Sequence, residues 1–322
     1  MNKYFFMKKI QMVDLQSQYY KIKADVDNAV LNVIDSAAFI NGPEVKSFQT
    51  ELEQYLDVKH VIPCANGTDA LQIALMALDS KEGDEIITAD FTFAATVEVV
   101  HLLKLKSVLV DVDYDTFTID IEKLKAAITP KTKAIIPVHI FGQCANMEEI
   151  LKVAKEHGLF VIEDNAQAIG SDFIFSDGTV KKSGTMGILG TTSFFPSKNL
   201  GCYGDGGAIF TNDDELAHKL RGIVNHGMYE RYYHDEVGVN SRLDSLQATI
   251  LRKKLPLLDG YNEARRKAAD YYDEAFAENP NILSPKRAVY STHVFHQYTL
   301  KILNGQRNEL QKFLTEKEVP AM

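Results

Sequence analysis

Helical spacing of apolar residues dominates the first part of the chain. Apolar side chains recur every three or four positions over residues 15–37, among them Ile22, Val26 and Val30, and this spacing predicts an amphipathic helix. The sequence Asn41-Gly42-Pro43 ends that helix and opens a second one that runs to Tyr55, because proline is accepted in the first turn of a helix but not in its interior. We therefore predict an N-terminal helical arm over residues 1–58.

Short apolar runs then alternate with helical stretches. A strongly apolar helix follows the turn at residues 64–69 and must be buried nearly all round, which implies a sheet beside it. Strands are predicted at residues 85–88, 107–112, 134–138, 160–163, 191–195 and 208–211, and helices at residues 94–104, 121–128 and 147–157. This alternation is typical of a mainly parallel sheet covered on both faces, with any site along the edge where the strands end. We predict that residues 59–240 form this large α/β domain.

The pattern changes after Ser241. A long charged helical segment extends to Glu278, followed by predicted strands within residues 294–302 and a helix over residues 307–318. We predict a smaller α+β domain over residues 241–322. We expect this domain to be incomplete, because the chain stops at Met322, where the pattern suggests a further strand.

Composition and charge exclude several classes of function. The 322 residues are 45% hydrophobic and 25% charged, which is ordinary for a globular protein with a sizeable core. A formal net charge of -9 argues against a nucleic-acid partner or an anionic membrane surface, and no run of ~18 apolar residues predicts a membrane span. Three cysteines without a C-x-x-C pair fit a reducing cytoplasm, and the nine histidines lack metal-ligand spacing, so no metal site is expected.

Lys198 stands in an unusual local sequence. Two phenylalanines and a proline precede it, and the glycine-rich stretch of residues 201–207 follows it. Most lysines are solvated surface residues. These flanks favour a dry pocket instead, where the pKa of a lysine falls and its amine becomes a nucleophile toward carbonyl groups.

Three further features have both an ordinary and a chemical interpretation. Asp164, at the end of a predicted strand, is either a helix cap or a buried anion that pairs with a pyridinium nitrogen. The turn at residues 66–69 is either ordinary capping or an anion site at a helix N-terminus, and Phe93 is either core or a flat surface for a flat cofactor. Together with Lys198, and in this order along the chain, the features describe a pyridoxal-phosphate site.

The sequence resembles the DegT-type nucleotide-sugar aminotransferases. Six stretches carry the resemblance, span nearly the whole chain and occur in the family's order: CANGTDAL (64–71), DFTFAAT (90–96), PVHIFGQ (137–143), VIEDNAQAIG (161–170), SFFPSKNLGCYGDGG (193–207) and GVNSRLDSLQA (238–248). The resemblance implies pyridoxal 5'-phosphate as cofactor and the aspartate-aminotransferase-like fold (fold type I). In that fold a large domain with a mainly parallel seven-stranded sheet precedes a smaller α+β C-terminal domain.

The resemblance also implies roles for individual residues. Lys198 would form the Schiff base with the cofactor, and Asp164 would meet the pyridine nitrogen. The remaining cofactor-binding positions would be Gln167 at the phenolic oxygen, Phe93 against the ring face, and Gly67, Thr68 and Ser193 at the phosphate.

The resemblance implies roles for two more residues, which would not contact the cofactor of their own subunit. Asn240 would complete the phosphate site of the neighbouring subunit, which would make a homodimer obligatory for activity. Arg242 would lie near an anionic part of the substrate; the alternative is that it only bridges the dimer.

The subgroup that matches best is the 3-aminotransferases of UDP-2-acetamido-2-deoxy-3-oxo-glucuronate. Their likeness implies transfer of an amino group from L-glutamate to that nucleotide sugar, for a surface polysaccharide such as lipopolysaccharide or for a protein glycan. Members continue past the position of Met322 with a His-Tyr-Pro-like segment near the sugar, so we expect this chain to be a fragment or a shortened product.

Three alternatives remain open at this point. A sugar dehydratase on the same scaffold would have a histidine in place of Lys198, and an amino-acid lyase would lack a groove for a nucleotide sugar. The third alternative is a non-catalytic ligand-binding or regulatory protein that keeps the scaffold.

Overall fold

Three helices form the N-terminal part of the computed structural model, which describes residues 10–322; the first nine residues of the predicted arm lie outside the described part. They are α1 (Leu15–Lys21), α2 (Lys23–Ser36) and α3 (Pro43–Leu56). The single helix predicted over residues 15–37 is therefore wrong, since Ile22 adopts φ -121° and ψ 16° and separates two helices. The apolar spacing continues across this break, so the pattern alone could not reveal it. As predicted, α3 begins with a proline in its first turn.

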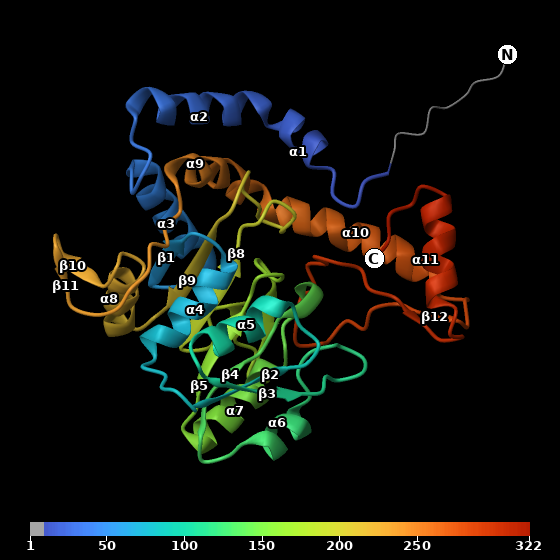
Figure 1. Cartoon of the computed structure of the whole chain (residues 1–322). Helices are drawn as coiled ribbons and strands as arrows, with labels where there is room; N and C mark the ends of the chain where they lie inside the picture. The colour runs from blue at the N-terminus through green and yellow to red at the C-terminus, as the bar shows by residue number, and fades with distance from the viewer. Residues whose placement is uncertain (1–9) are drawn as a thin grey trace.

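A seven-stranded sheet lies at the centre of the molecule (Figure 1). The strands β3, β2, β4, β5 and β8 are parallel neighbours, and β9 runs antiparallel to both β8 and β1. This arrangement confirms the predicted mainly parallel sheet. In spatial order the strands are β1 (His60–Cys64), β9 (Gly207–Thr211), β8 (Leu189–Ser193), β5 (Phe160–Asp164), β4 (Thr132–Ile136), β2 (Glu85–Ala89) and β3 (Lys106–Val110).

Helices cover both faces of this sheet. Because side chains alternate along a strand, Ile86 packs under α4 (Gly67–Ala77), α5 (Ala94–Leu102) and α8 (Asp214–Ile223). Its neighbour Ile87 faces the opposite side, which α6 (Ile121–Ala127) and α7 (Met147–His157) cover. Beyond these two helices, α3 and α9 (Ser245–Lys254) pack on the same face around Phe48 and Phe210. Among the apolar runs read from the sequence, β2 and β9 are buried on both sides, whereas β3 at the edge of the sheet is partly exposed.

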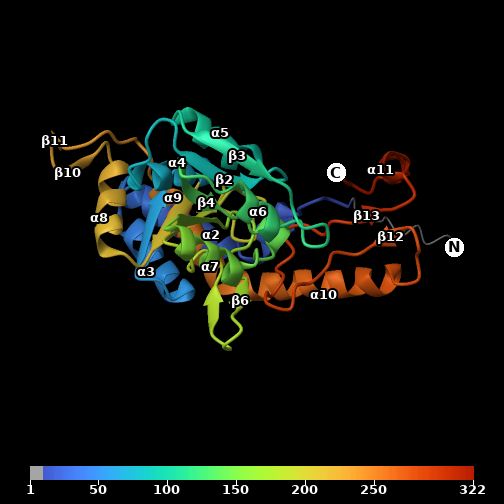
Figure 2. The same ribbon diagram turned by 90° about the horizontal axis from the view of Figure 1, so that it is seen from below.

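The C-terminal part is built around a long helix, α10 (Leu258–Phe276), which follows α9 through the short turn η2 (Leu255–Leu257). Figure 2 shows α10 leading to α11 (Arg307–Glu316), β12 (Ile282–Leu283) and β13 (Lys301–Ile302) at one end of the molecule. The predicted strands over residues 294–302 are wrong except at residues 301–302. The backbone before them bonds instead to the η1 turn (Ile140–Gly142), through Val294 N–H to Gly142 O and Gln297 N–H to Phe141 O.

Two hairpins project from this framework. The β10–β11 hairpin (Met228–Glu230 and Tyr233–His234) extends beside α8, at the opposite end from α11 (Figure 2). The other hairpin is β6–β7 (Asp172–Ile174 and Val180–Lys182). The division of the chain at residues 58 and 240 stays a prediction. Helices α3 and α9, which lie on the outer sides of these two boundaries, pack into one hydrophobic cluster with β9.

Candidate active site

The carboxyl ends of two parallel strands bring the site together. Strand β5 ends at Asp164 and its neighbour β8 ends at Ser193. Ser193 in turn lies against the start of α4, because a Cβ atom added to Gly67 would be 2.7 Å from Ser193 Cβ. The structure therefore places three predicted site residues, Gly67, Asp164 and Ser193, along one edge of the sheet, as expected for a parallel α/β fold.

The N-terminus of α4 has the chemistry of an anion site. Asn66 caps the helix, and its side-chain oxygen accepts a hydrogen bond from Asp69 N–H at 2.8 Å. The N–H groups of Gly67 and Thr68 fall in the first turn, where a helix offers no internal acceptor and carries the positive end of its dipole. These groups can bind a phosphate.

Asp164 is held as a buried carboxylate. It is 5% exposed; Oδ2 accepts a hydrogen bond from Thr96 Oγ1 at 2.8 Å and Oδ1 accepts one from Ala166 N–H at 3.2 Å. Thr96 is fully buried on α5 and also bonds to Thr92 Oγ1 at 2.9 Å. The sequence interpretation missed Thr96, although it closes the stretch that contains Phe93. Its position on the buried face of an apolar helix was the available signal.

Lys198 lies in the loop that follows β8. Its backbone N–H donates to Phe195 O at 2.8 Å, and Cys202 N–H donates to Phe194 O at 2.8 Å, so the glycine-rich stretch folds back on the strand end. Burial lowers the pKa of the Lys198 amine, and the nearby charge of Asp164 raises it in part. The structure thus brings the two residues on which the predicted chemistry depends within electrostatic range of each other.

Gln167 and Phe93 differ in how they are held. Gln167 Oε1 accepts a hydrogen bond from Phe141 N–H at 2.7 Å, which orients the side chain, and its amide N–H groups have no partner among residues 10–322. Phe93 is the N-cap residue of α5 and is 70% exposed, so its ring has an open face. Their predicted contacts with a cofactor stay predictions.

Asn240 and Arg242 flank a residue tied to the anion site. Ser241 Oγ accepts from Ala65 N–H at 3.0 Å and donates to Asp69 Oδ2 at 2.6 Å, which holds this segment against the first turn of α4. Asn240 itself is exposed, and Arg242 is half-buried and forms no ion pair with another residue of the described chain. Their predicted roles across a subunit interface and toward a substrate stay predictions.

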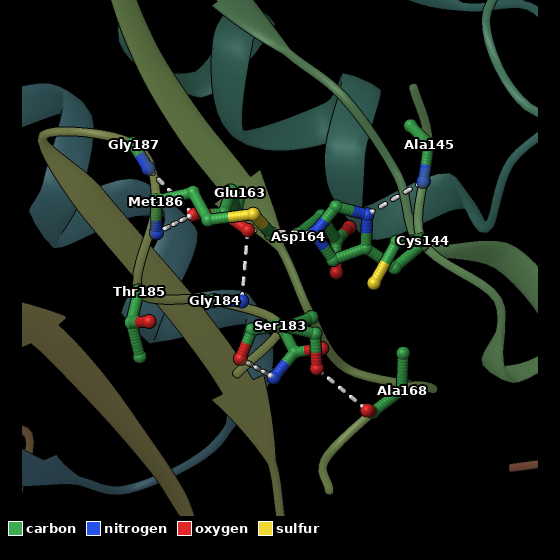
Figure 3. A network of polar contacts seen from close by, with 12 residues as sticks. Cys144, Ala145, Glu163, Asp164, Ala168, Ser183, Gly184, Thr185, Met186 and Gly187 are labelled. Carbon is green, nitrogen blue, oxygen red and sulfur yellow. Dashed lines mark hydrogen bonds and ion pairs between the residues drawn. The ribbon is translucent and has the colours of Figure 1, made fainter. Parts of the chain in front are cut away.

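A second buried carboxylate, Glu163, fixes the end of β5 (Figure 3). It accepts hydrogen bonds from the backbone N–H groups of Gly184, Met186 and Gly187 at 2.8, 2.5 and 2.6 Å, and it lies 2.8 Å from His139 Nε2. His139 Nδ1 accepts from a backbone N–H at 3.1 Å, so Nε2 carries the proton of the ring and donates to Glu163. These donors offset the desolvation of the charge, and they keep the adjacent Asp164 in place.

Neither a metal centre nor a membrane span is found within residues 10–322. No group of three or more histidine, cysteine, aspartate or glutamate side chains there could hold a metal ion. None of the helices in that part of the chain is both long and apolar enough to cross a membrane.

Comparisons with known proteins identify the family. Residues 20–322 match the model of the DegT/DnrJ/EryC1/StrS aminotransferase family. The chain is 47% identical to a pleiotropic regulatory protein of Geobacillus stearothermophilus, over 97% of this chain and 83% of that protein. It is 46% identical to the UDP-2-acetamido-2-deoxy-3-oxo-D-glucuronate aminotransferase of Pseudomonas aeruginosa, over 97% of this chain and 84% of the relative.

Solved structures show the same fold. The DesV protein of S. venezuelae, crystallised in complex with a ketimine intermediate, has a TM-score of 0.92 and 36% identity over 97% of this chain and 82% of that one. NtdA of Bacillus subtilis, crystallised with bound cofactor PMP, has a TM-score of 0.88 and 31% identity over 99% of this chain and 72% of that one. These likenesses confirm the predicted fold class.

The residues of this chain fit pyridoxal phosphate. Asp164 is a buried carboxylate suited to a protonated ring nitrogen, Lys198 is an amine whose pKa burial lowers, and the start of α4 suits a phosphate. The absence of a side chain at Gly67 lets Ser193 approach that helix. The protein is a pyridoxal-phosphate-dependent enzyme and belongs to the DegT/DnrJ/EryC1/StrS aminotransferase family.

Proposed function

We propose that this enzyme transfers the amino group of L-glutamate to a nucleotide-linked keto sugar, UDP-2-acetamido-2-deoxy-3-oxo-glucuronate. The burial of Lys198 in the field of Asp164 carries the proposal, because burial favours the neutral, nucleophilic form of the amine and the charge of Asp164 acts on it. The name of the P. aeruginosa relative supports the choice of sugar.

The chain's own residues would divide the work as follows. Pyridoxal phosphate, when bound, supplies the electron-accepting ring that stabilises negative charge at the α-carbon of the donor. Lys198 would take the proton from that carbon as a general base and would later deliver a proton to the sugar carbon that receives the amino group, because burial lowers its pKa and so favours the neutral amine. Asp164 would keep the ring nitrogen protonated, while Phe93 and Gln167 would orient the ring.

Arg242 is the proposed contact for the acidic sugar. A guanidinium offers paired donors that match the two oxygens of a carboxylate. In the alternative role, as a bridge between subunits, replacement would weaken the dimer without changing the choice of sugar. We expect Arg242→Gln to reduce turnover of the uronate more than that of the matching neutral UDP-linked 3-keto sugar, at unchanged dimer dissociation.

One assay tests the proposed reaction against its rivals. The purified protein is incubated with L-glutamate and a panel of UDP- and dTDP-linked keto sugars, and the products are identified by mass. We expect an aminated UDP-uronate and 2-oxoglutarate. A deoxygenated sugar would indicate a dehydratase. If none of the keto sugars is consumed, the result contradicts the proposal and favours the regulatory role suggested by the name of the G. stearothermophilus relative.

We further propose a homodimer in which Asn240 reaches the cofactor phosphate of the partner. The attachment of the neighbouring Ser241 to the first turn of α4 supports a position near the anion site. Mixing inactive Lys198→Ala and Asn240→Ala chains would then restore part of the activity, because one site of each hybrid dimer would be intact. Verified hybrid dimers without activity would contradict this placement.

The setting of the reaction follows from the same substrates. We propose a cytoplasmic enzyme whose aminated product is used for a surface polysaccharide such as lipopolysaccharide. The three cysteines support this setting, since all are buried and unpaired as expected in a reducing compartment.

A further inference from the structure

Two buried amide side chains meet directly beneath the loop that carries Lys198. Asn199, the next residue along the chain, is 4% exposed and Asn262 on α10 is 1% exposed. Asn199 Nδ2 donates to Asn262 Oδ1 at 2.7 Å and to Val294 O at 3.0 Å. The hydrogen bond between these buried amides is costly to lose, because the groups that form it would then be buried without a partner, as Asn199 Oδ1 already is within the described structure.

The pair joins segments that are far apart in the sequence. Asn262 Nδ2 donates to Ile169 O at 3.3 Å, in the segment that follows Asp164. The approach is close, since a Cβ atom added to Gly170 would lie 2.6 Å from Asn262 Nδ2. One amide on α10 therefore contacts both the loop that follows Asp164 and the loop that carries Lys198.

The same face of α10 also holds the segment that contains Val294. Arg265, three residues after Asn262 and on the same side of the helix, donates from Nη1 to Phe295 O at 3.0 Å and to His296 O at 3.3 Å. Burial, together with the charges of Lys198 and Arg265, lowers the pKa of the His296 ring to about 3, so a neutral ring lies within electrostatic range of Lys198. The contacts that Asn262 and Arg265 of α10 make thus lie in the surroundings of the Lys198 amine.

We propose that Asn199 and Asn262 are positioning residues for Lys198. This inference rests on the proposed function, in which Lys198 is the catalytic amine. A lysine side chain has four rotatable carbons, so the direction of its amine depends on a fixed backbone at its base. The Asn199–Asn262 hydrogen bond fixes the residue next to that base against a long helix. A misplacement of ~1 Å in a catalytic group costs about a hundredfold in rate, so loss of this bond acts on turnover as well as on stability.

Hydrogen exchange in the cofactor-free protein tests the placement directly. The Lys198 N–H donates to Phe195 O, so its exchange rate reports whether the loop is held. We compare Asn199→Ala, Asn262→Leu and the double variant with a matched control, Tyr298→Phe. Tyr298 OH donates to Asp273 Oδ1 at 2.7 Å, so the control breaks a hydrogen bond between α10 and the 291–303 segment away from Lys198.

Each single asparagine variant should speed exchange at Lys198 about tenfold or more and lower kcat by a similar factor, with little change in KM for the amino donor. The loss in the double variant should be clearly smaller than the sum of the losses in the singles, because the two residues share the Asn199–Asn262 hydrogen bond. Tyr298→Phe should change neither quantity. If Asn262→Leu does not fold, Asn199→Ala and the control carry the test.

Exchange at Lys198 that is as slow in the asparagine variants as in the control would overturn the positioning role, and so would additive losses in the double variant. Because exchange is measured without cofactor or substrate, this outcome is independent of the reaction. A wild-type protein that turns over no substrate would instead contradict the proposed function and leave the exchange result valid.

Discussion

The substitution Thr96→Val removes a hydrogen bond to the Asp164 carboxylate while Asp164 stays buried. The substitution keeps a β-branched side chain of nearly the same size on α5, and it removes the hydroxyl that donates to Asp164 Oδ2 at 2.8 Å. Ala166 N–H, at 3.2 Å from Oδ1, then remains as a donor to the carboxylate. Asp164 then stays buried with one hydrogen-bond donor fewer.

The size of the effect follows from the type of hydrogen bond. A bond to a charged group contributes ~1.5–3 kcal/mol. If the bond stabilises the charged carboxylate that a protonated ring nitrogen requires, its loss lowers the affinity for pyridoxal phosphate, or the turnover number, by about 10- to 150-fold. The free energy of unfolding should fall as well, because the substitution also leaves Thr92 without its partner at 2.9 Å.

Thr88→Val is the matched control for Thr96→Val. Thr88 is also fully buried, and its Oγ1 donates to a backbone oxygen, Ile136 O, at 2.8 Å rather than to the site. We expect both variants to lose stability in thermal unfolding, and only Thr96→Val to lose cofactor affinity in a spectroscopic titration. Equal cofactor affinity in the two variants would refute the role given to Thr96.

Two other perturbations test the site from different sides. Gly67→Ala would place a Cβ atom 2.7 Å from Ser193 Cβ, so the start of α4 must shift; we expect pyridoxal-phosphate affinity to fall about tenfold in the same titration, and unchanged affinity would show that the phosphate lies elsewhere. Lys254→Met removes a buried lysine whose Nζ donates to Gly201 O at 2.7 Å and whose pKa burial lowers to about 8. Because the unfolded chain binds the proton more tightly, with a pKa of 10.5, wild-type stability should gain up to ~1.4 kcal/mol per pH unit above pH 8. Denaturant unfolding should show this gain relative to Lys254→Met between pH 8 and 10, and a constant difference would contradict it.

The sequence was sufficient for the parts of the fold with strong local signals. Continuous apolar runs such as that of β5 predicted the parallel strands, and the aromatic and glycine-rich flanks of Lys198 indicated its burial. Strand β1 was not predicted, because Pro63 weakens its pattern. In the structure this strand is at the edge of the sheet and pairs with β9 alone, which is where a proline is tolerated.

Contacts between distant residues could not be read from one sequence. Thr96 and Asp164 are 68 residues apart and Asn199 and Asn262 are 63 apart, so each pair depends on how helices pack on the sheet. Residues 294–300 have the composition of a strand, but their backbone groups bond to a turn and to Arg265. Tertiary contacts override local preference in this segment.

Borohydride reduction of the pyridoxal-phosphate-loaded protein, followed by mass spectrometry of its peptides, tests the central claim most directly. The account predicts a phosphopyridoxyl group on the peptide that contains Lys198, and none on Lys198→Ala protein treated in the same way. Attachment to another lysine such as Lys254, or equal labelling of both proteins, would contradict it.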